Sequence, residues 1–310
     1  MPISESQRVT MLEPPKGRLR VVMDTDTFNE IDDQFALVQM MLSPDRFDVE
    51  AIYAAPFFIE GRSSGPEDGM EQSYDEILRL FERLNISGTD LVHKGVRGYV
   101  GAQKLARDAP AVDDLISRAR SATPEAPLYV LAIAAISNVA SAIIKAHDIV
   151  DRIVVVWLGG HALAWPHNEE FNLLQDIGGA QVLFDSGVPL VWVPVEGATS
   201  NLLSTVPEIE RYVEPCGAIG AFLAMRFKEY SDVHKGWSKR IWDMAAVGWL
   251  LNSDWAPSVL MSAPILNDQM NWSRDHRRHQ IRCVTFVDRD AMFQDLIDKL
   301  ENFAGVPSRM

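Results

Sequence analysis

Short apolar runs rich in Val, Ile and Leu recur along the chain and alternate with segments of helical apolar spacing. Near-continuous apolar strands are typical of a parallel sheet that is covered on both faces. The runs are RLRVVMD (18–24), FDVEAIYAAP (47–56), APLYVLAIA (126–134), DRIVVVWLGG (151–160) and GVPLVWVPV (187–195). This alternation predicts an α/β fold: a mainly parallel open sheet with helices on both faces and a doubly wound, Rossmann-like core.

The segments between and after these runs are predicted helices, of which EQSYDEILRLFERLN (71–85) is the clearest amphipathic example. The final third, from about residue 204, is more helical, and residues 279–303 are predicted to be hairpin-like and to end in a helix. Residues 1–17 are predicted to form an extended lead-in that ends at Pro14 and Pro15. The sequence contains no repeat and no obvious linker, so we expect a single domain over residues 1–310.

Composition narrows the possible partners and compartments. The formal net charge of −14 argues against a nucleic-acid partner, because phosphate binding needs basic surface. The two cysteines, Cys216 and Cys283, form no CxxC pair, so a thiolate zinc site is not expected and a reducing compartment is. Neither a signal-peptide core nor an apolar run of membrane-spanning length is present. We therefore expect a soluble, cytoplasmic protein with no membrane partner.

One stretch, LRVVMDTDTFNEIDDQFAL (19–37), crowds five acidic residues between two apolar segments: Asp24, Asp26, Glu30, Asp32 and Asp33. Helix capping accounts for Asp32 and in part for Asp33, but not for Asp24 and Asp26 at the end of a buried strand. Carboxylates packed together repel one another unless they are protonated or neutralised by a cation. Oxygen ligands favour Ca²⁺ or Mg²⁺ over zinc, so the stretch predicts a hard-metal site.

Two reaction classes fit an aspartate pair at a strand end. VVMDTDT matches the DxDxT signature of phosphohydrolases of the haloacid-dehalogenase type, in which Asp24 and Asp26 would do the chemistry. The other class is metal-assisted hydrolysis, in which a carboxylate contacts both the metal and the attacking water.

Five motifs, in order, resemble those of the inosine-uridine preferring nucleoside hydrolases. The first is VVMDTDTFNEIDDQFAL, and the others are LAIAAISNVASAI, IVVVWLGGHA, NEEFNLLQDIGGAQVLFDSGVPLVWVP and RIWDMAAVGWLL. The resemblance covers about residues 19–250. It implies hydrolysis of the N-glycosidic bond of a ribonucleoside or related riboside. The haloacid-dehalogenase interpretation does not explain the four later motifs.

The resemblance also implies roles for individual residues. A Ca²⁺ ion, with Mg²⁺ less favoured, would be held by Asp26, Asp33, Asp243 and the backbone carbonyl of Ile133. Asp26 would be the general base, and Asp24 would support the cluster. The expected ribose contacts are Asp32, Glu170 and Asn172. Carboxylate and amide oxygens there would stabilise the positive charge that develops on the sugar.

The sequence departs from the family pattern around the leaving group. The turn TFNEI is two residues longer than usual, which places Asn29 and Glu30 near the site. Trp242 replaces a histidine proposed as the acid in pyrimidine-cleaving members, and Phe58 and Ala164 stand where asparagines are expected. The candidates for a rebuilt leaving-group side are Trp165, Trp242, His161, His167 and His93, whereas Trp157, Trp192 and Trp249 are expected in the core.

Several alternatives stay open at the level of sequence. The protein could be a non-catalytic riboside-binding protein on the same fold, or it could cleave a different ribosyl bond. The nucleobase or leaving group and the general acid are not identified by the sequence. The resemblance implies a homodimer or homotetramer.

Overall fold

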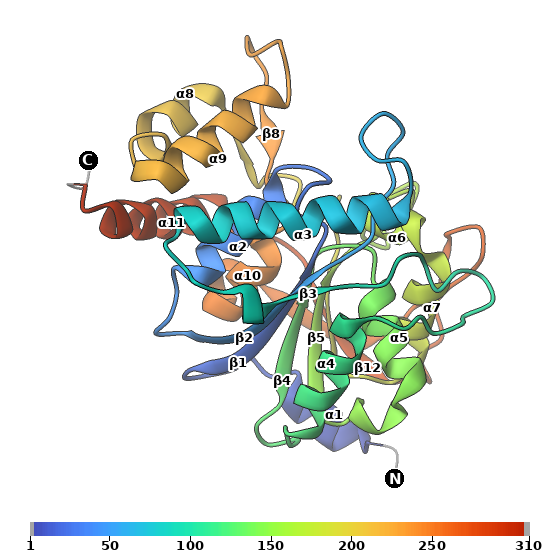
Figure 1. Ribbon diagram of the computed structural model, residues 1–310. Coiled ribbons are helices and arrows are strands. Elements are labelled where there is room, and N and C mark those ends of the chain that lie inside the picture. The colour runs from blue at the N-terminus through green and yellow to red at the C-terminus, as the bar shows by residue number, and fades with distance from the viewer. Residues whose placement is uncertain (1–2, 307–310) are drawn as a thin grey trace.

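The computed structural model describes residues 3–306 and contains one eight-stranded sheet (Figure 1). Neighbouring strands are parallel except for the edge strand β9, which is antiparallel to β12. In spatial order the strands are β3 (Val92–Lys94), β2 (Phe47–Ala54), β1 (Leu19–Thr25), β4 (Leu128–Ala132), β5 (Ile153–Leu158), β6 (Leu190–Val193), β12 (Gln280–Val284) and β9 (Ser258–Ser262). The predicted mainly parallel, doubly wound sheet is confirmed.

Helices cover both faces of the sheet, which explains why the central strands carry no polar face. All residues of β4, β5 and β6 are buried. One buried cluster joins a sheet face to α2 (Asp32–Met41), α3 (Pro66–Arg83), α9 (Gly217–Glu229), α10 (Met244–Leu251) and α11 (Arg289–Ala304). The other joins the opposite face to α4 (Pro110–Arg120), α5 (Ser137–Lys145) and α7 (Ile177–Asp185).

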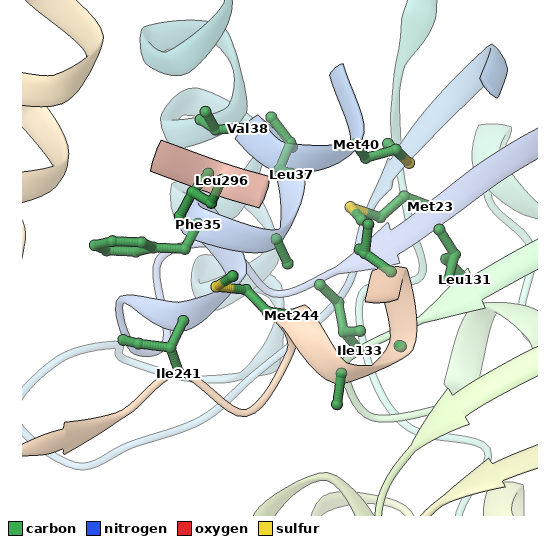
Figure 2. Packing of buried hydrophobic residues seen from close by; sticks show 14 of the residues in the cluster. Met23, Phe35, Leu37, Val38, Met40, Leu131, Ile133, Ile241, Met244 and Leu296 are labelled. Carbon is green, nitrogen blue, oxygen red and sulfur yellow. The ribbon is translucent and has the colours of Figure 1, made fainter. Parts of the chain in front are cut away.

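Close packing of α2 and α10 against β1 and β4 fixes the floor on which the site is built. Figure 2 shows Met23 of β1 beside Met40 of α2, and Ile133, directly after β4, beside Met244 of α10. These side chains have no solvent exposure. Each buried aliphatic or Met side chain contributes about 1.5–3 kcal/mol through removal from water, so both helix starts are held firmly at the sheet edge.

Smaller elements complete the chain. They are α1 (Glu5–Met11), α6 (Phe171–Gln175), α8 (Val206–Glu208), a π-helical turn (Ile209–Val213), 3₁₀ turns at Thr89–Leu91, His147–Ile149 and Ser253–Trp255, and the strand pairs β7 (Leu203–Ser204) with β8 (Lys239–Arg240) and β10 (Ile265–Leu266) with β11 (Trp272–Ser273). In Figure 1, α8, α9 and β8 lie together at one end of the molecule, beyond α3. No helix among residues 3–306 has both the length and the apolar character needed to cross a bilayer.

Three expectations about local structure need correction. The lead-in is not extended throughout, because Ser4 caps α1 by accepting from the Gln7 amide, and Met11 is buried. The helix expected at 71–85 begins earlier, at Pro66, since proline is preorganised for a first helical turn. The segment 279–303 holds one strand and a helix rather than a hairpin, because the antiparallel partner of β12 is β9, which lies upstream of that segment.

Candidate functional site

The site lies where the strand order reverses, between β1 and β4. The amide of Ile133, directly after β4, donates to the carbonyl of Asp24 over 2.9 Å, so the carboxyl ends of the two strands are joined. Ligands of open α/β sheets bind at such a switch point, outside the carboxyl ends of the strands. The acidic stretch therefore opens at the place where the fold provides a crevice.

A cavity of about 260 Å³ occupies this crevice. Its wall includes most of the residues that the sequence placed at the site: Asp26, Asn29, Glu30, Asp32, Asp33, Ile133, His161, Trp165, His167, Glu170, Asn172, Trp242 and Asp243. The other wall residues are Leu158, Glu169, Phe171, Val195 and Glu196. Asp24 and Phe58 are not in the wall. Phe58 is 43% exposed, and its backbone amide donates to Gln175.

Three buried carboxylates form the floor. Oxygens of Asp32, Asp33 and Asp243 lie within 4.8 Å of one another, a spacing that suits a shared metal ion. Asp32 and Asp33 open α2 and Asp243 precedes α10, yet none of the three is the side-chain cap of its helix. Capping therefore does not explain these carboxylates, even though each stands at a helix start.

Asp26 lies beside the floor, just beyond the end of β1. It is 1% exposed, and its Oδ2 has no hydrogen-bond partner among the described residues. Burial raises the pKa of Asp26, and the charges of Asp33 and Asp32 raise it further. A buried carboxylate oxygen without a partner is costly unless something else compensates it, so it points to a missing ligand.

Without a cation, the ionised forms of the floor carboxylates are disfavoured. Burial raises the pKa of Asp33 to about 8, with the charge of Asp32 adding to it. Burial also raises the pKa of Asp32 to about 6, against the opposing charge of Lys239. Clustered carboxylates of this kind fit a hard divalent cation, because the positive charge of the ion favours their ionised forms. The residues present therefore fit a metal ion.

Asp24 is not in the cavity wall, and its side chain holds neighbouring elements together. Its Oδ1 accepts from Asn138 Nδ2 over 2.7 Å, and Asn138 Oδ1 accepts from the amide of Val96 over 2.8 Å. Burial raises the pKa of Asp24 to about 7. These bonds tie the end of β1 to the start of α5 and to the loop after β3. Asn138 lies in the motif LAIAAISNVASAI, but the sequence did not indicate that it pairs with Asp24.

Glu170 and Asn172 also belong to the cavity wall. Glu170 caps α6 by accepting from the amides of Asn172 and Leu173, and it also accepts from the amide of Gly160 over 2.7 Å. Asn172 donates to the carbonyl of Leu158 over 3.1 Å. That bond holds the amide group at the cavity wall and leaves Oδ1 without a hydrogen bond to any described residue.

The long turn 27–31 is held from the C-terminal half of the chain. Glu30 accepts from Lys239 of β8 and, over 2.7 Å, from the hydroxyl of Tyr230. Lys239 is 7% exposed, and its ammonium also lies 3.7 Å from Asp32. Asn29 is buried in the wall, with its Oδ1 unpaired among the described residues. No sequence signal marked Lys239, which lies just before the motif RIWDMAAVGWLL and outside it.

Aromatic rings form the remaining side of the cavity. The ring of His161 lies 5.2 Å from that of His167 and 6.3 Å from that of Trp165, in edge-to-face arrangements. His93 is elsewhere, 3.7 Å from Asp114 and outside the wall. Trp157, Trp192 and Trp249 are fully buried, as expected for core residues.

The fold and the site together define an α/β protein with an acidic, cation-compatible ligand pocket at a topological switch point. The chain belongs to the inosine-uridine preferring nucleoside hydrolase family, whose sequence profile matches residues 67–294. It is accordingly an enzyme of the N-ribosyl hydrolase class. The matched region includes Glu170, Asn172 and Asp243 but not the acidic stretch 24–33.

Solved structures share the fold at low sequence identity. A purine-preferring ribonucleoside hydrolase from Gardnerella vaginalis is 18% identical with a TM-score of 0.72, and the match covers 92% of this chain and 99% of that one. An inosine-uridine preferring nucleoside hydrolase from Bacillus anthracis is 16% identical with a TM-score of 0.64, over 92% and 99% of the two chains. An effector protein is 14% identical with a TM-score of 0.66, over 97% and 98%. No curated protein sequence matches this chain.

Proposed function

We propose that this protein hydrolyses the N-glycosidic bond of a ribonucleoside or related riboside, giving ribose and the free base. The observation that carries the proposal is one cavity whose wall includes three clustered carboxylates, Asp26, Glu170 and Asn172. In this reaction, the oxygen of water forms a bond to the anomeric carbon, the carbon–nitrogen bond breaks, and its electron pair leaves with the base.

Asp26, Asp33, Asp243 and the carbonyl of Ile133 would hold a Ca²⁺ ion, for which Mg²⁺ is the less favoured alternative. Asp32 is close enough to the other floor carboxylates to bind either the ion or a ribose hydroxyl. When bound, the ion supplies positive charge that orients the sugar hydroxyls and acidifies the attacking water.

The chain's own residues would carry the remaining steps. Asp26 is in the wall with a free carboxylate oxygen, so it can accept the proton that water loses on attack. Glu170 and Asn172 present a carboxylate and an amide oxygen to a ring that becomes positively charged as the glycosidic bond breaks.

The direct test is turnover of inosine, uridine and other ribosides with Ca²⁺ present, scored as free ribose. We expect the wild type to release ribose, and Asp26→Ala to lose activity by at least about 10³-fold while it keeps its circular dichroism spectrum. Asp254→Ala is the matched control, because Asp254 is exposed and outside the cavity. Turnover by Asp26→Ala would refute the assignment of the base.

A second candidate is a riboside-binding protein without catalysis. It is motivated by Trp242, which stands in the wall where pyrimidine-cleaving members of the family carry a histidine. Calorimetric binding of a riboside by the wild type, with no ribose released for any riboside in the presence of metal, would favour this candidate over hydrolysis.

Compartment and assembly are further parts of the proposal. The chain has two cysteines in all, Cys216 and Cys283, and both are buried, which supports a cytoplasmic location in a reducing compartment. A homodimer or homotetramer is the assembly that the family resemblance suggests, and light scattering on the purified protein measures it.

A further inference from the structure

His161 is fixed at the cavity wall by three hydrogen bonds. Its amide donates to Asn168 Oδ1 over 2.6 Å, and its carbonyl accepts from the indole of Trp272 over 3.0 Å. Its ring Nδ1 accepts from the amide of Glu196 over 3.2 Å. The backbone and the ring of His161 are therefore oriented before any ligand arrives.

The backbone turn at Gly160, directly before His161, is also constrained. Gly160 has φ +68°, and a Cβ there would meet the side chains of Leu173 at 3.0 Å and Trp272 at 3.1 Å. A larger residue would be strained in this backbone conformation as well as crowded. The amide of Val195 donates to the carbonyl of Gly160, so the loop is bound to the end of β6 just beside the cavity.

The bond to Glu196 decides which ring nitrogen carries the proton. A backbone amide only donates, so Nδ1 of His161 must be the acceptor and is unprotonated. The ring is then the neutral tautomer with its proton on Nε2. Nε2 has no hydrogen-bond partner among the described residues, and His161 is part of the cavity wall.

The surroundings keep the ring neutral near pH 7. Burial lowers the pKa of His161, the neighbouring His167 lowers it further, and Glu196 opposes them. The other ionisable groups of the cavity wall on this side are Glu169 and Glu170, and Glu170 is itself engaged by three backbone amides. Protonation of His161 would also break the bond from the Glu196 amide, because Nδ1 could no longer accept it.

We propose that His161 is a preorganised neutral hydrogen-bond donor whose Nε2–H binds the leaving group of the riboside, a nucleobase with an acceptor atom at that edge. This assignment rests on the proposed function. As the carbon–nitrogen bond breaks, the base gains the electron pair, and its growing negative charge strengthens the bond from Nε2–H. His161 keeps its proton, and the proton that completes the free base comes from solvent.

A neutral donor predicts a different pH response from an acid. An imidazolium acid would impose an alkaline limb on kcat, and that limb would vanish when His161 is replaced by a side chain that does not titrate. A neutral donor imposes no such limb, so His161→Gln should keep the shape of the wild-type pH profile. Gln is the informative replacement, because its amide nitrogen reaches about as far as Nε2 and can donate there.

The test compares two substrates and three variants. Inosine has a base that leaves poorly without assistance, whereas p-nitrophenyl β-D-riboside releases a stable phenolate. We expect His161→Ala to lower kcat/KM for inosine by about 10²-fold and for the p-nitrophenyl riboside by less than about three-fold. His161→Gln should recover most of the loss. His161→Asn should not, since its shorter amide replaces Nδ1 rather than Nε2. His147→Ala, at an exposed histidine outside the cavity, is the control.

The outcomes separate this assignment from the proposed function. If the wild type cleaves neither substrate, both proposals fall. If the wild type cleaves both substrates and His161→Ala is impaired equally on the two, only the role of His161 is refuted. An alkaline limb that disappears in His161→Gln would overturn the neutral donor in favour of an acid. Nitrogen NMR of the His161 ring provides a readout that needs no turnover, and a proton on Nδ1 at pH 7 would also overturn the assignment.

Discussion

The side chain of Lys239 links the acidic turn to the floor of the cavity. Its ammonium contacts Glu30 and lies 3.7 Å from Asp32, and the lysine is nearly buried. We predict that Lys239→Met lowers the free energy of unfolding by about 3 kcal/mol, because it leaves two largely buried carboxylates without their cation. Urea denaturation measures the loss.

The double variant Lys239→Met/Glu30→Gln is the matched control for this prediction. It removes one of the two orphaned charges, so it should recover part of the lost stability. If the loss of stability in the double variant equals the sum of the losses in Lys239→Met and Glu30→Gln, the two residues are not coupled.

At the scale of residues, the sequence identified site side chains that lie within recognisable motifs. It missed residues outside those motifs that contact them in the fold. Asp26, Asp33 and Asp243 could be assigned to one site because each lies in a motif of the family. Lys239 could not, because it lies just outside the motif that begins at Arg240, on a strand of two residues that shows no periodicity. Asn29 was expected near the site because the turn is longer than usual, and it does lie in the cavity wall.

Among the elements, α1 differs most clearly from the prediction, which was an extended lead-in over residues 1–17. Arg8 donates from Nε to the carbonyl of Gly187 over 2.8 Å, and Glu5 accepts from the amide of Gln280 at the start of β12 over 2.6 Å. Arg8→Ala should lower the free energy of unfolding by about 1–3 kcal/mol, since a buried charged donor to a carbonyl is lost.

Arg277→Ala provides the comparison for α1 in the same denaturation experiment. The Arg277 side chain is 90% exposed and is paired with Asp275 on the surface, so its removal should change stability by less than about 0.5 kcal/mol. Equal effects of the two substitutions would show that α1 is not part of the cooperative fold.

The difference between predicted and missed elements has a physical basis. Apolar runs such as residues 153–158 are buried on both sides, and such runs have few alternatives to a central strand. A seven-residue helix such as α1 is too short for periodicity to distinguish it from a loop, and Pro14 and Pro15 suggested extended chain. The π-helical turn at Ile209–Val213 depends on packing against α9 and α11, which no local pattern reports.

For the whole molecule, the alternation of strands and helices predicted the doubly wound sheet, and that sheet fixes where a ligand can bind. The two-sided burial of β1 and β4 leaves the crevice at their carboxyl ends as the natural opening. The side of the cavity formed by His161, Trp165 and Trp242 could not be predicted to the same degree. Its shape depends on loops from different parts of the chain.

The proposed metal site joins α2 to α10, so an ion bound there should stabilise the whole fold. Asp33 and Asp243 are far apart in the sequence, and their carboxylates repel each other when no cation is present. We predict that Ca²⁺ at about 100 times its dissociation constant raises the free energy of unfolding by about 2.7 kcal/mol and shifts Tm upward by several degrees, with a smaller effect from Mg²⁺. Thermal denaturation before and after chelation measures this.

In chelator, Asp243→Asn should be more stable than the wild type, because one repelling charge is gone. It should show no shift of Tm with Ca²⁺, whereas the exposed Asp254→Asn should behave like the wild type. An equal shift in Asp243→Asn would remove that residue from the ion's ligands, and no shift in the wild type would refute the site itself.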